Sequence, residues 1–368
     1  MKLRYRLSIG LLVVMGLGII TLGFVLSHDS ECPPPASGLE TASTMKSIQY
    51  HCYGSPEVLR LENVDIPQLQ DNEVLVKVKA ASVNPLDWHF MRGKPYIMRL
   101  IAGIGAPRDP NLGVDFAGTV EAVGSNVTRF RPGEQVFGSA SGAFGEYVRF
   151  KEERGVAIKP VNISHKQAAA VPIAGVTALQ GLRDHGQVRA GQKVLINGAS
   201  GGVGTFAVQI AKAMGAEVTG ICSTRNVELV RSIGADYVID YTRQDFTQLE
   251  KRYDVILDNV GNHSIGDLRR VMEPKGTLVT VGTSSKGNFI GPLWRPLRTS
   301  LIDPFVGQQL KNFTARMKHE DMVALAELMR AGELTPVIDQ EFSLRQIRDA
   351  ISYSESGHAR AKIVIDIQ

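Results

Sequence analysis

The sequence predicts an α/β protein in which a β-rich domain and a doubly wound parallel sheet follow an N-terminal transmembrane helix. Three observations predict this class. Short strand-like segments crowd the chain from about residue 45 to residue 150. Strand and helix patterns then alternate from residue 193 to residue 281, which is typical of parallel βαβ units. Before both regions, residues 7–26 form an almost wholly apolar run without a charge.

The apolar run at residues 7–26 is long enough to cross a bilayer, because about 20 apolar residues match the hydrocarbon thickness. We therefore expect residues 1–30 to form a single-pass membrane anchor, with the lipid bilayer as a partner. The alternatives are a buried helix and a removed signal or transit segment, although residues 27–31 offer no good cleavage site. Lys2, Arg4 and Arg6 precede the run and favour a cytoplasmic N-terminus, but the side of the membrane stays open.

The overall composition is that of a folded protein with room for two domains. Of 368 residues, 43% are hydrophobic and 21% are charged, and the net charge is +4. No basic stripe is interleaved with aromatic residues, so nucleic acid is not an expected partner. Cys32, Cys52 and Cys222 are odd in number and widely spaced, so we expect neither a disulfide framework nor a cysteine zinc site. That cysteine usage suits a reducing compartment.

A β-rich domain is expected over residues 45–165. The preceding residues 31–44 are rich in Pro, Ser and Thr, and their three consecutive prolines cannot continue a helix, so they predict a linker. Within the domain, residues 73–80 alternate with the period of a half-buried strand. Further strands are expected at residues 47–53, 58–64, 114–123, 135–138 and 145–150. Residues 163–186 look helical and lead into the second region.

The stretch from residue 193 to residue 225 carries the most specific motif. A short apolar strand at residues 194–196 is followed by Gly198, Gly201, Gly202 and Gly204, which permit a sharp turn and close approach of a ligand. A helix begins at about Thr205, and its free N–H groups suit a pyrophosphate. A second strand follows at residues 217–221. Because strand, turn, helix and strand come in this order, the stretch predicts a dinucleotide site, with an ordinary tight turn as the alternative.

The residues after the second strand favour NADPH over NADH. An NAD site usually offers Asp or Glu to the ribose hydroxyls at this point. This chain offers Ser223, Thr224 and Arg225 instead. Hydroxyl groups and a guanidinium suit a 2′-phosphate, which an acidic side chain would repel.

The strand and helix alternation continues after this unit and predicts a sheet of about six strands over residues 166–304. The expected strands and helices are at residues 227–233, 237–240, 255–258, 265–271 and 276–281. An amphipathic helix around residues 322–329 and a last strand at residues 361–367 belong to a C-terminal region, residues 305–368.

Several separate motifs follow one another along the chain: SVNPLDW at residues 82–88, GVDFAG at 113–118, PGEQV at 132–136, GVTA at 175–178 and the glycine turn. Together they resemble the medium-chain dehydrogenase/reductase superfamily, and within it the zinc-independent quinone oxidoreductase branch that includes zeta-crystallin. The resemblance covers residues 45–368. It implies a GroES-like catalytic domain, an inserted Rossmann domain, a C-terminal return to the catalytic domain, and a cofactor in the cleft between them.

The resemblance also implies that both zinc sites of the family are absent. Zinc-dependent members place a Cys and a Gly-His-Glu motif where this chain has Asn84 and the Gly-Val-Asp of residues 113–115. They also carry four closely spaced cysteines, which this chain lacks. Without a Lewis acid, hydrogen-bond donors must polarise a substrate carbonyl.

Site residues follow from the motifs that match the family. Asn84, Asp87 and Thr177 are expected at the nicotinamide and substrate end, and Tyr96 is a looser assignment as a proton donor. Asn84 could instead form a turn, Asp87 could cap a helix, and Tyr96 could be a packed aromatic. The expected cofactor-binding residues are Ser200, Gly201, Gly202 and Val203 at the pyrophosphate, Ser223 and Arg225 at the 2′-phosphate, and Tyr241, Asn259, Val281, Gly282 and Lys362 elsewhere.

The activity that the resemblance implies is NADPH-dependent reduction of a quinone or an α,β-unsaturated carbonyl. Apolar stretches near residues 96–104 and 289–301 are expected to shape a pocket for a hydrophobic acceptor. A homodimer is left open. A membrane-tethered NADPH-binding sensor or scaffold with little turnover is the alternative, and a zinc alcohol dehydrogenase is disfavoured by the missing ligands.

Overall fold

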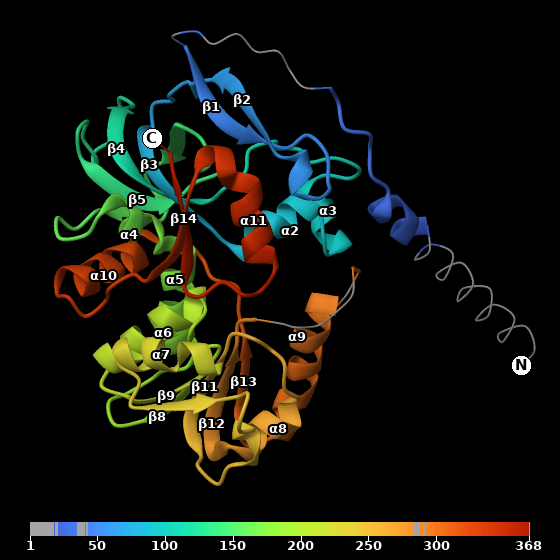
Figure 1. The fold of residues 1–368 in the computed structure, drawn as a ribbon, viewed down its shortest axis with the longest axis vertical. Helices are drawn as coiled ribbons and strands as arrows, with labels where there is room; N and C mark the ends of the chain where they lie inside the picture. Colours follow the sequence, from blue (N-terminus) through green and yellow to red (C-terminus); the bar gives the residue numbers. More distant parts are fainter. Residues whose placement is uncertain are drawn as a thin grey trace, which may run out of the picture.

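The computed structural model describes residues 18, 21–34, 41, 43–282, 288–289 and 291–367, without the side chains of residues 291–296 and 305. Figure 1 shows two lobes, with the β-rich catalytic domain above and the parallel sheet below. The expected α/β class is thereby confirmed. The C-terminus lies in the upper lobe, so the chain leaves that lobe and later returns to it.

The catalytic domain is built on a seven-stranded sheet with strand order β14-β15-β3-β4-β5-β7, and β6 pairs with β3. These strands are β3 (Glu73–Val83), β4 (Asp115–Val123), β5 (Gln135–Ser139), β6 (Tyr147–Lys151), β7 (Val156–Ile158), β14 (Ile338–Ser343) and β15 (Lys362–Asp366). A separate antiparallel pair contains β1 (Thr44–Gln49) and β2 (Arg60–Asp65). The last strand, β15, lies between β14 and β3, so the end of the chain completes the middle of this sheet.

The period of two in β3 is visible in only part of its burial. Val74, Val76 and Val78 are buried and Lys77 is exposed, but Leu75 on the Lys77 face is buried as well. The antiparallel pairing with β15 places Ile363 opposite Val83, next to the start of helix α2 (Pro85–Arg92). The pairing therefore places β15 beside the end of β3, where α2 begins.

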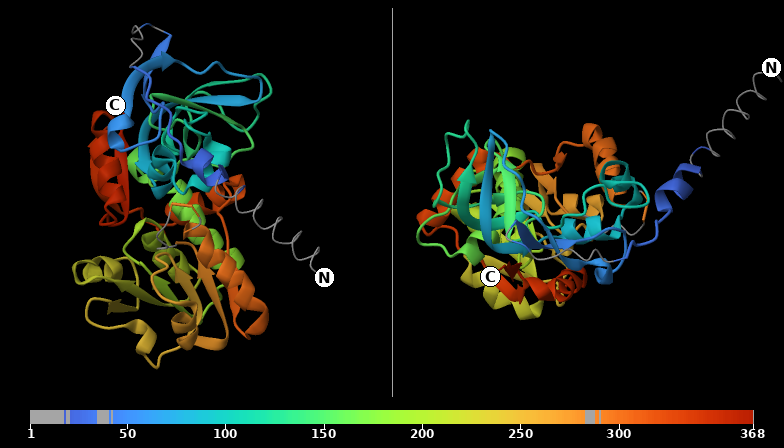
Figure 2. Two further views of the ribbon diagram at one scale, coloured as in Figure 1. Left: turned by 90° about the vertical axis from the view of Figure 1, so that its right-hand side faces the viewer. Right: turned by 90° about the horizontal axis from the view of Figure 1, so that it is seen from above.

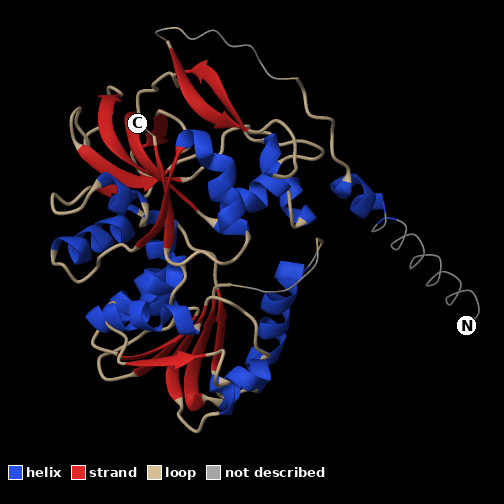
Figure 3. Ribbon diagram, in the orientation of Figure 1, coloured by secondary structure: helices blue, strands red, loops and turns tan. Residues whose placement is uncertain are grey.

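The lower lobe contains a six-stranded parallel sheet with strand order β10-β9-β8-β11-β12-β13. Helices cover both of its faces (Figure 3). Its elements are β8 (Lys193–Asn197), α6 (Gly202–Ala213), β9 (Glu217–Cys222), α7 (Val227–Ser232), β10 (Tyr237–Asp240), β11 (Tyr253–Asp258), α8 (Ile265–Arg270), β12 (Met272–Thr280), α9 (Gly291–Ile302) and β13 (Gln309–Asn312). The order reverses between β8 and β11, and ligands bind at the carboxyl ends of strands at such a point.

Helices between the two sheets join the domains through a shared core. They are α4 (His165–Ala169), α5 (Pro172–Gln180) and α10 (His319–Arg330), whereas α11 (Ile347–Glu355) packs beside α2. Met322, Leu325 and Met329 of α10 are fully buried, as the amphipathic pattern predicts. One hydrophobic cluster contains these side chains together with Phe137 of the catalytic sheet and Leu257 of the parallel sheet. The two lobes are therefore packed against one another through apolar contacts.

The expected membrane anchor is corrected by the structure. Among the described residues, none of the helices has the length and apolar character needed to cross a membrane. Most of the apolar run at residues 7–26 lies outside the described residues, and its described part belongs to a short helix at residues 21–27.

The segment that follows this short helix runs along the side of the catalytic domain (Figure 2). The backbone N–H of Ser30 donates to the carbonyl of Gly105, with 2.9 Å between the atoms. A disulfide joins Cys32 to Cys52, so the expectation of no disulfide is wrong for these two cysteines. Their spacing in the sequence did not reveal the pair, because the segment folds back onto the catalytic domain. Cys222 is a buried free thiol.

Candidate active site

A cleft of about 610 Å³ lies between the two domains, and residues of both domains line it. It opens at the carboxyl ends of β8, β9 and β11, and the reversal of strand order between β8 and β11 predicts a ligand site there. The predicted site residues that line it are Asn84, Ser200, Gly201, Gly202, Val203, Ser223, Arg225, Tyr241, Asn259 and Lys362. The structure therefore brings most of the predicted cofactor site together with one of the predicted catalytic residues.

The glycine turn forms one wall of the cleft. Gly198 has φ +77°, a left-handed conformation that favours glycine. A Cβ on Gly204 would lie 2.0 Å from the carbonyl oxygen of Gly198, so glycine is required where the first turn of α6 packs on β8. Helix α6 begins at Gly202, and the first N–H groups of a helix have no partner within it. This cradle fits a pyrophosphate.

The ribose end of the cleft contains a residue that sequence reasoning missed. Asn226 is buried and donates through Nδ2 to the hydroxyls of Ser200 (3.0 Å) and Ser223 (3.1 Å). Its Oδ1 is buried without a partner among the described residues. Asn226 thus connects two predicted cofactor-binding hydroxyls and leaves an acceptor for a ligand donor. The signal in the sequence that could have identified Asn226 was its position three residues after Ser223.

Arg225 connects the two domains across the cleft. Its Nη2 donates to the backbone carbonyl of His358, with 2.7 Å between the atoms. The guanidinium is exposed and lies at the same end as Tyr241, whose ring is 58% exposed. Because His358 belongs to the C-terminal return, Arg225 holds a catalytic-domain loop beside the ribose end.

The remaining predicted cofactor residues lie at the ends of β11 and β12. Asn259 donates from Nδ2 to the carbonyl of Asn197 (3.1 Å), and its Oδ1 is buried without a partner among the described residues. Val281 and Gly282 donate their N–H groups to the carbonyl of Asp258. A Cβ on Gly282 would lie 1.9 Å from the Asn259 carbonyl oxygen. These two residues support the strand ends but do not line the cleft.

A buried polar network forms the floor of the cleft. Lys362 Nζ donates to Asn84 Oδ1 (2.7 Å), and Asn84 Nδ2 donates to Asp115 Oδ2 (2.9 Å). Lys362 Nζ also lies 3.7 Å from the same carboxylate oxygen of Asp115. Burial raises the pKa of Asp115 and lowers that of Lys362, while their mutual attraction opposes both shifts. Sequence reasoning named Asp115 only as part of a motif.

Asp87 has the helix-capping role that was weighed as its alternative. It stands at the third position of α2 and accepts from the backbone N–H of Asn84, with 2.7 Å between the atoms. Burial raises its pKa to about 7, and nearby Asp115 adds to the shift while the Asn84 hydrogen bond opposes it. Asp87 does not line the cleft, so it acts on the site through Asn84.

Thr177 and Tyr96 also lie outside the cleft lining. The Thr177 hydroxyl donates to the carbonyl of Ile173 one helical turn earlier, with 2.6 Å between the oxygens. The Tyr96 ring packs edge-on against Phe289, with 4.9 Å between ring centroids, and 4.7 Å from the Arg99 guanidinium carbon. In this arrangement Tyr96 packs as an aromatic between the catalytic domain and the loop after β12.

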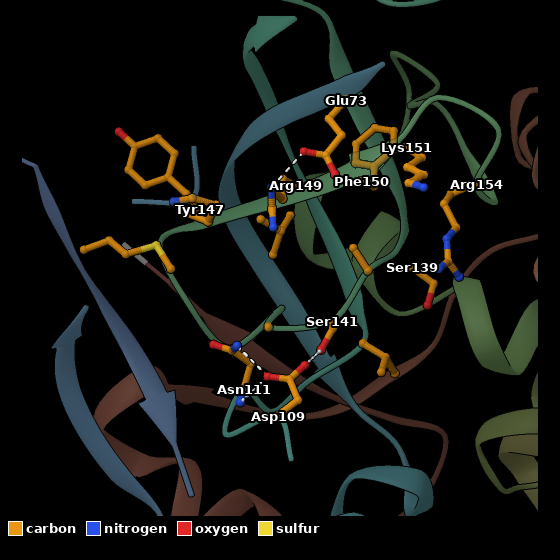
Figure 4. Close-up of a pocket in the computed structure, with 16 residues that line it drawn as sticks. Glu73, Asp109, Asn111, Ser139, Ser141, Tyr147, Arg149, Phe150, Lys151 and Arg154 are labelled. Atoms are coloured by element: carbon orange, nitrogen blue, oxygen red, sulfur yellow. Dashed lines mark hydrogen bonds and ion pairs between the residues drawn. The ribbon is translucent and has the colours of Figure 1, made fainter. Parts of the chain in front are cut away.

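A second hollow of about 460 Å³ lies within the catalytic domain and contains none of the glycine turn (Figure 4). Its central ionic contact joins Arg149 to Glu73 at 3.0 Å. The carboxylate of Asp109 accepts from Asn111 and Ser141. These polar groups are satisfied within the hollow, so we assign the candidate site to the interdomain cleft. Within the described part of the chain, no group of three or more His, Cys, Asp or Glu side chains could hold a metal ion.

Comparison with family models and known proteins agrees with this geometry. Residues 70–160 match the family model described as alcohol dehydrogenase GroES-like domain, and residues 233–365 match the one described as zinc-binding dehydrogenase. The chain is 33% identical to 2-methylene-furan-3-one reductase of Solanum lycopersicum, over 94% of this chain and 85% of the relative.

Two further similarities concern an enzyme and a solved structure. The NADPH-dependent alkenal/one oxidoreductase of Arabidopsis thaliana chloroplasts is 33% identical over 87% of this chain and 79% of that protein. The crystal structure of Escherichia coli quinone oxidoreductase complexed with NADPH superposes with a TM-score of 0.74 at 25% identity, covering 88% of this chain and 100% of that one. The chain therefore belongs to the medium-chain dehydrogenase/reductase superfamily, in its zinc-independent quinone oxidoreductase branch.

Proposed function

We propose that this protein is an NADPH-dependent oxidoreductase that reduces a quinone or an α,β-unsaturated carbonyl compound. One observation carries the proposal: the glycine turn of α6 and the buried Asn84–Lys362 pair face the same cleft from opposite domains. A dinucleotide whose pyrophosphate lies at the turn reaches toward the catalytic domain with its nicotinamide end.

The residues of the cleft fit NADPH. The free N–H groups at the start of α6 suit the pyrophosphate, and Ser200 and Ser223 are held by Asn226 in a row toward the ribose end. Arg225 and Ser223 would hold the 2′-phosphate. The relatives support this choice, since one is named as NADPH-dependent and the Escherichia coli structure contains NADPH. When bound, NADPH supplies the hydride.

The floor of the cleft offers the positive charge of Lys362 beside the place where a carbonyl oxygen would be polarised. Lys362 and Asn84 are both nearly fully buried, and an electrostatic interaction is stronger in such a site than in water. Holding hydride donor and acceptor together in a closed cleft reduces the entropic part of the barrier. One proton must join the hydride, and it is taken from solvent, because the hydroxyl hydrogen of Thr177 is already donated to the carbonyl of Ile173.

The acceptor class follows from what the relatives have in common. Quinones, alkenals and 2-methylene-furan-3-one all contain a carbon–carbon double bond conjugated to a carbonyl, and each appears in the name of a relative. Hydride addition to such a system places negative charge on the carbonyl oxygen, which a proton then neutralises. We propose that this conjugated unit, and not an isolated ketone, is what the cleft reduces.

The test is an acceptor screen on the full chain, followed by the loss of NADPH absorbance. Matched pairs such as cyclohexenone and cyclohexanone separate reduction of the conjugated bond from ketone reduction, and benzoquinone represents the quinones. We expect turnover of the enone or the quinone and none of the saturated ketone. Tight NADPH binding without oxidation by any acceptor would instead support an NADPH-binding sensor or scaffold.

Metal dependence gives a second test of the same proposal. Asn84 stands where zinc-dependent members carry a cysteine, and Val114 stands where their Gly-His-Glu motif carries its histidine, so we propose that turnover needs no metal. Dialysis against a strong chelator is expected to leave the rate unchanged. A rate that falls on chelation and returns with added zinc would contradict this part of the proposal.

A further inference from the structure

Asp115 is the most deeply buried charged group at the cleft floor, with an exposed fraction of 0%. Its carboxylate is surrounded by four donors from three separate places in the chain. Ser82 Oγ (3.2 Å), Asn84 Nδ2 (2.9 Å) and the backbone N–H of Ile173 (3.1 Å) donate to it, and Lys362 Nζ lies at 3.7 Å. These donors stabilise the buried carboxylate, because each of them offsets part of the cost of burying the charge.

The carboxylate determines which way the Asn84 amide points. Asp115 when ionised can only accept hydrogen bonds, and the Lys362 ammonium can only donate them. The amide nitrogen must therefore face Asp115 and the amide oxygen must face Lys362, as observed at 2.9 Å and 2.7 Å. In the flipped orientation, both contacts would bring like groups together. Asn84 is held in one orientation as long as both neighbours keep their charges.

Lys362 is held in place by the same group. Its ammonium has three hydrogens, and the partners around it are Asn84 Oδ1 (2.7 Å), the Val83 carbonyl (3.3 Å) and Asp115 (3.7 Å). Its methylene stem lies against the glycine turn, where a Cβ on Gly202 would come 3.3 Å from Lys362 Cδ. The side chain therefore passes beside the cofactor cradle and ends at the network.

Two carboxylates face the Lys362 ammonium from the elements packed around it. They are Asp115 on β4 and Asp87 on α2, and both favour its charged form. Burial opposes the charge and is the larger effect on the pKa of Lys362. Asp87 already accepts from the Asn84 backbone and carries a pKa raised to about 7, so Asp115 is the carboxylate in direct ion-pair distance.

We propose that Asp115 is a positioning residue, whose carboxylate orients the Asn84 amide and keeps the Lys362 ammonium charged and in place at the cleft floor. Asp115 does not line the cleft and acts through these two side chains. The inference rests on the proposed function, because it gives Lys362 a role beside the reacting carbonyl. Without the Asp115 carboxylate, the site is expected to keep its shape but to lose the charge of the Lys362 ammonium.

The test compares Asp115→Asn with Lys362→Gln and with the double variant. Asp115→Asn keeps the side-chain volume and removes the charge. We expect kcat for the enone to fall at least about tenfold at pH 8, and the alkaline limb of the kcat profile to move about one unit or more toward lower pH. The direction follows because a lysine that loses its carboxylate partner deprotonates at a lower pH. In the double variant, Asp115→Asn is expected to add little to the loss caused by Lys362→Gln.

A matched control is Asp321→Asn. Asp321 is also buried and paired, through Arg183 at 2.7 Å and Gln180 at 2.6 Å, but it lies outside the cleft. It is expected to lower stability without moving the pH profile. An Asp115→Asn profile that coincides with that of Asp321→Asn, or losses that multiply in the double variant, would overturn the inference.

Folding and turnover are separated by two further measurements. If Asp115→Asn alone fails to fold, the double variant removes both charges together and leaves no unpaired ammonium, so it is expected to fold. A double variant that also fails to fold, while Lys362→Gln folds, would show that Asp115 is structural only.

NADPH titration by fluorescence needs no turnover. If the acceptor screen fails for the wild type, a weaker and more pH-sensitive NADPH affinity in Asp115→Asn still supports positioning, and an unchanged affinity contradicts it.

Discussion

The guanidinium of Arg99 lies 2.7 Å from the carboxylate of Asp29, and this ion pair joins a fully buried cation to the N-terminal segment. Arg99 also donates to the carbonyls of Leu26 (2.9 Å) and His28 (3.0 Å) and stacks 4.3 Å from the Tyr53 ring. A buried guanidinium needs such partners. The segment before β1 therefore completes the packing of the catalytic domain.

Replacing Arg99 by Ala is expected to lower the free energy of unfolding by about 3 kcal/mol, because it removes several buried hydrogen bonds and the stacking on Tyr53. Urea unfolding followed by intrinsic fluorescence measures this. Arg131→Ala, at an exposed arginine, is the control and should change the free energy by less than about 0.5 kcal/mol. Equal values for both variants would mean that the N-terminal segment adds nothing to the fold.

Arg225→Ala is expected to weaken NADPH binding by about 10- to 100-fold and NADH binding by much less, since a charge-assisted contact to the 2′-phosphate is lost. Fluorescence titration with both cofactors gives the ratio. Arg243→Ala is the comparison, because its guanidinium is exposed and lies 3.5 Å from Asp240 at the same end of the sheet. A larger effect at Arg243 would assign the phosphate to that residue.

Asp87→Asn is expected to change how stability depends on pH. With a folded pKa of about 7 against an ordinary 3.8, native Asp87 keeps a proton that the unfolded chain loses, so stability falls as pH rises through this window. A pKa shift of this size corresponds to a change of about 4 kcal/mol in the free energy of unfolding. The variant should lose this slope between about pH 4 and pH 7. Urea midpoints across the range measure it, with the exposed Asp349→Asn as control. Parallel slopes for the wild type and Asp87→Asn would refute the prediction.

Thr177→Val is expected to leave kcat within about twofold, because the hydroxyl hydrogen is given to the Ile173 carbonyl and valine has nearly the same shape. Steady-state kinetics with the best acceptor of the screen measures this. A decrease in kcat of tenfold or more, in a variant that still folds, would mean that Thr177 takes part in catalysis.

Ala361→Gly is expected to raise the free energy of unfolding by about 0.5 kcal/mol. Ala361 has φ +56°, where a side chain costs about 1–2 kcal/mol, and glycine offsets part of that gain through its freer unfolded chain. Ala350→Gly in α11 is the contrast and should destabilise by about 1 kcal/mol. Destabilisation by both changes would show that the Ala361 backbone carries no strain.

The fold class and the cofactor cradle could be predicted because their signals are local. The glycine turn, the helix after it and the strand before it lie within one stretch of chain, and the backbone geometry requires glycine at Gly198 and Gly204. Strand β13 could not be predicted, since it is four residues long and buries only Leu310. It extends the parallel sheet beyond residue 304, where we expected the C-terminal return to begin.

The floor of the cleft was less accessible to sequence reasoning, because its residues meet only in the folded chain. Asp115 and Lys362 belong to strands that lie far apart in the sequence. Neither strand pattern reveals that the two side chains face each other. The N-terminal segment illustrates the opposite error. Its apolar residues led to the prediction of a membrane span. The observed contacts, such as that from Arg99 to Leu26, are made by backbone carbonyls, which a hydropathy pattern does not record.

Strand β15 has a consequence for how the protein is made. It lies inside the catalytic sheet, between β14 and β3, and it carries Lys362 to the cleft floor. During synthesis, all six strands of the parallel sheet, β13 included, leave the ribosome before β15. The parallel sheet can therefore fold and expose its glycine turn early, but the cleft acquires Lys362 only when β15 emerges.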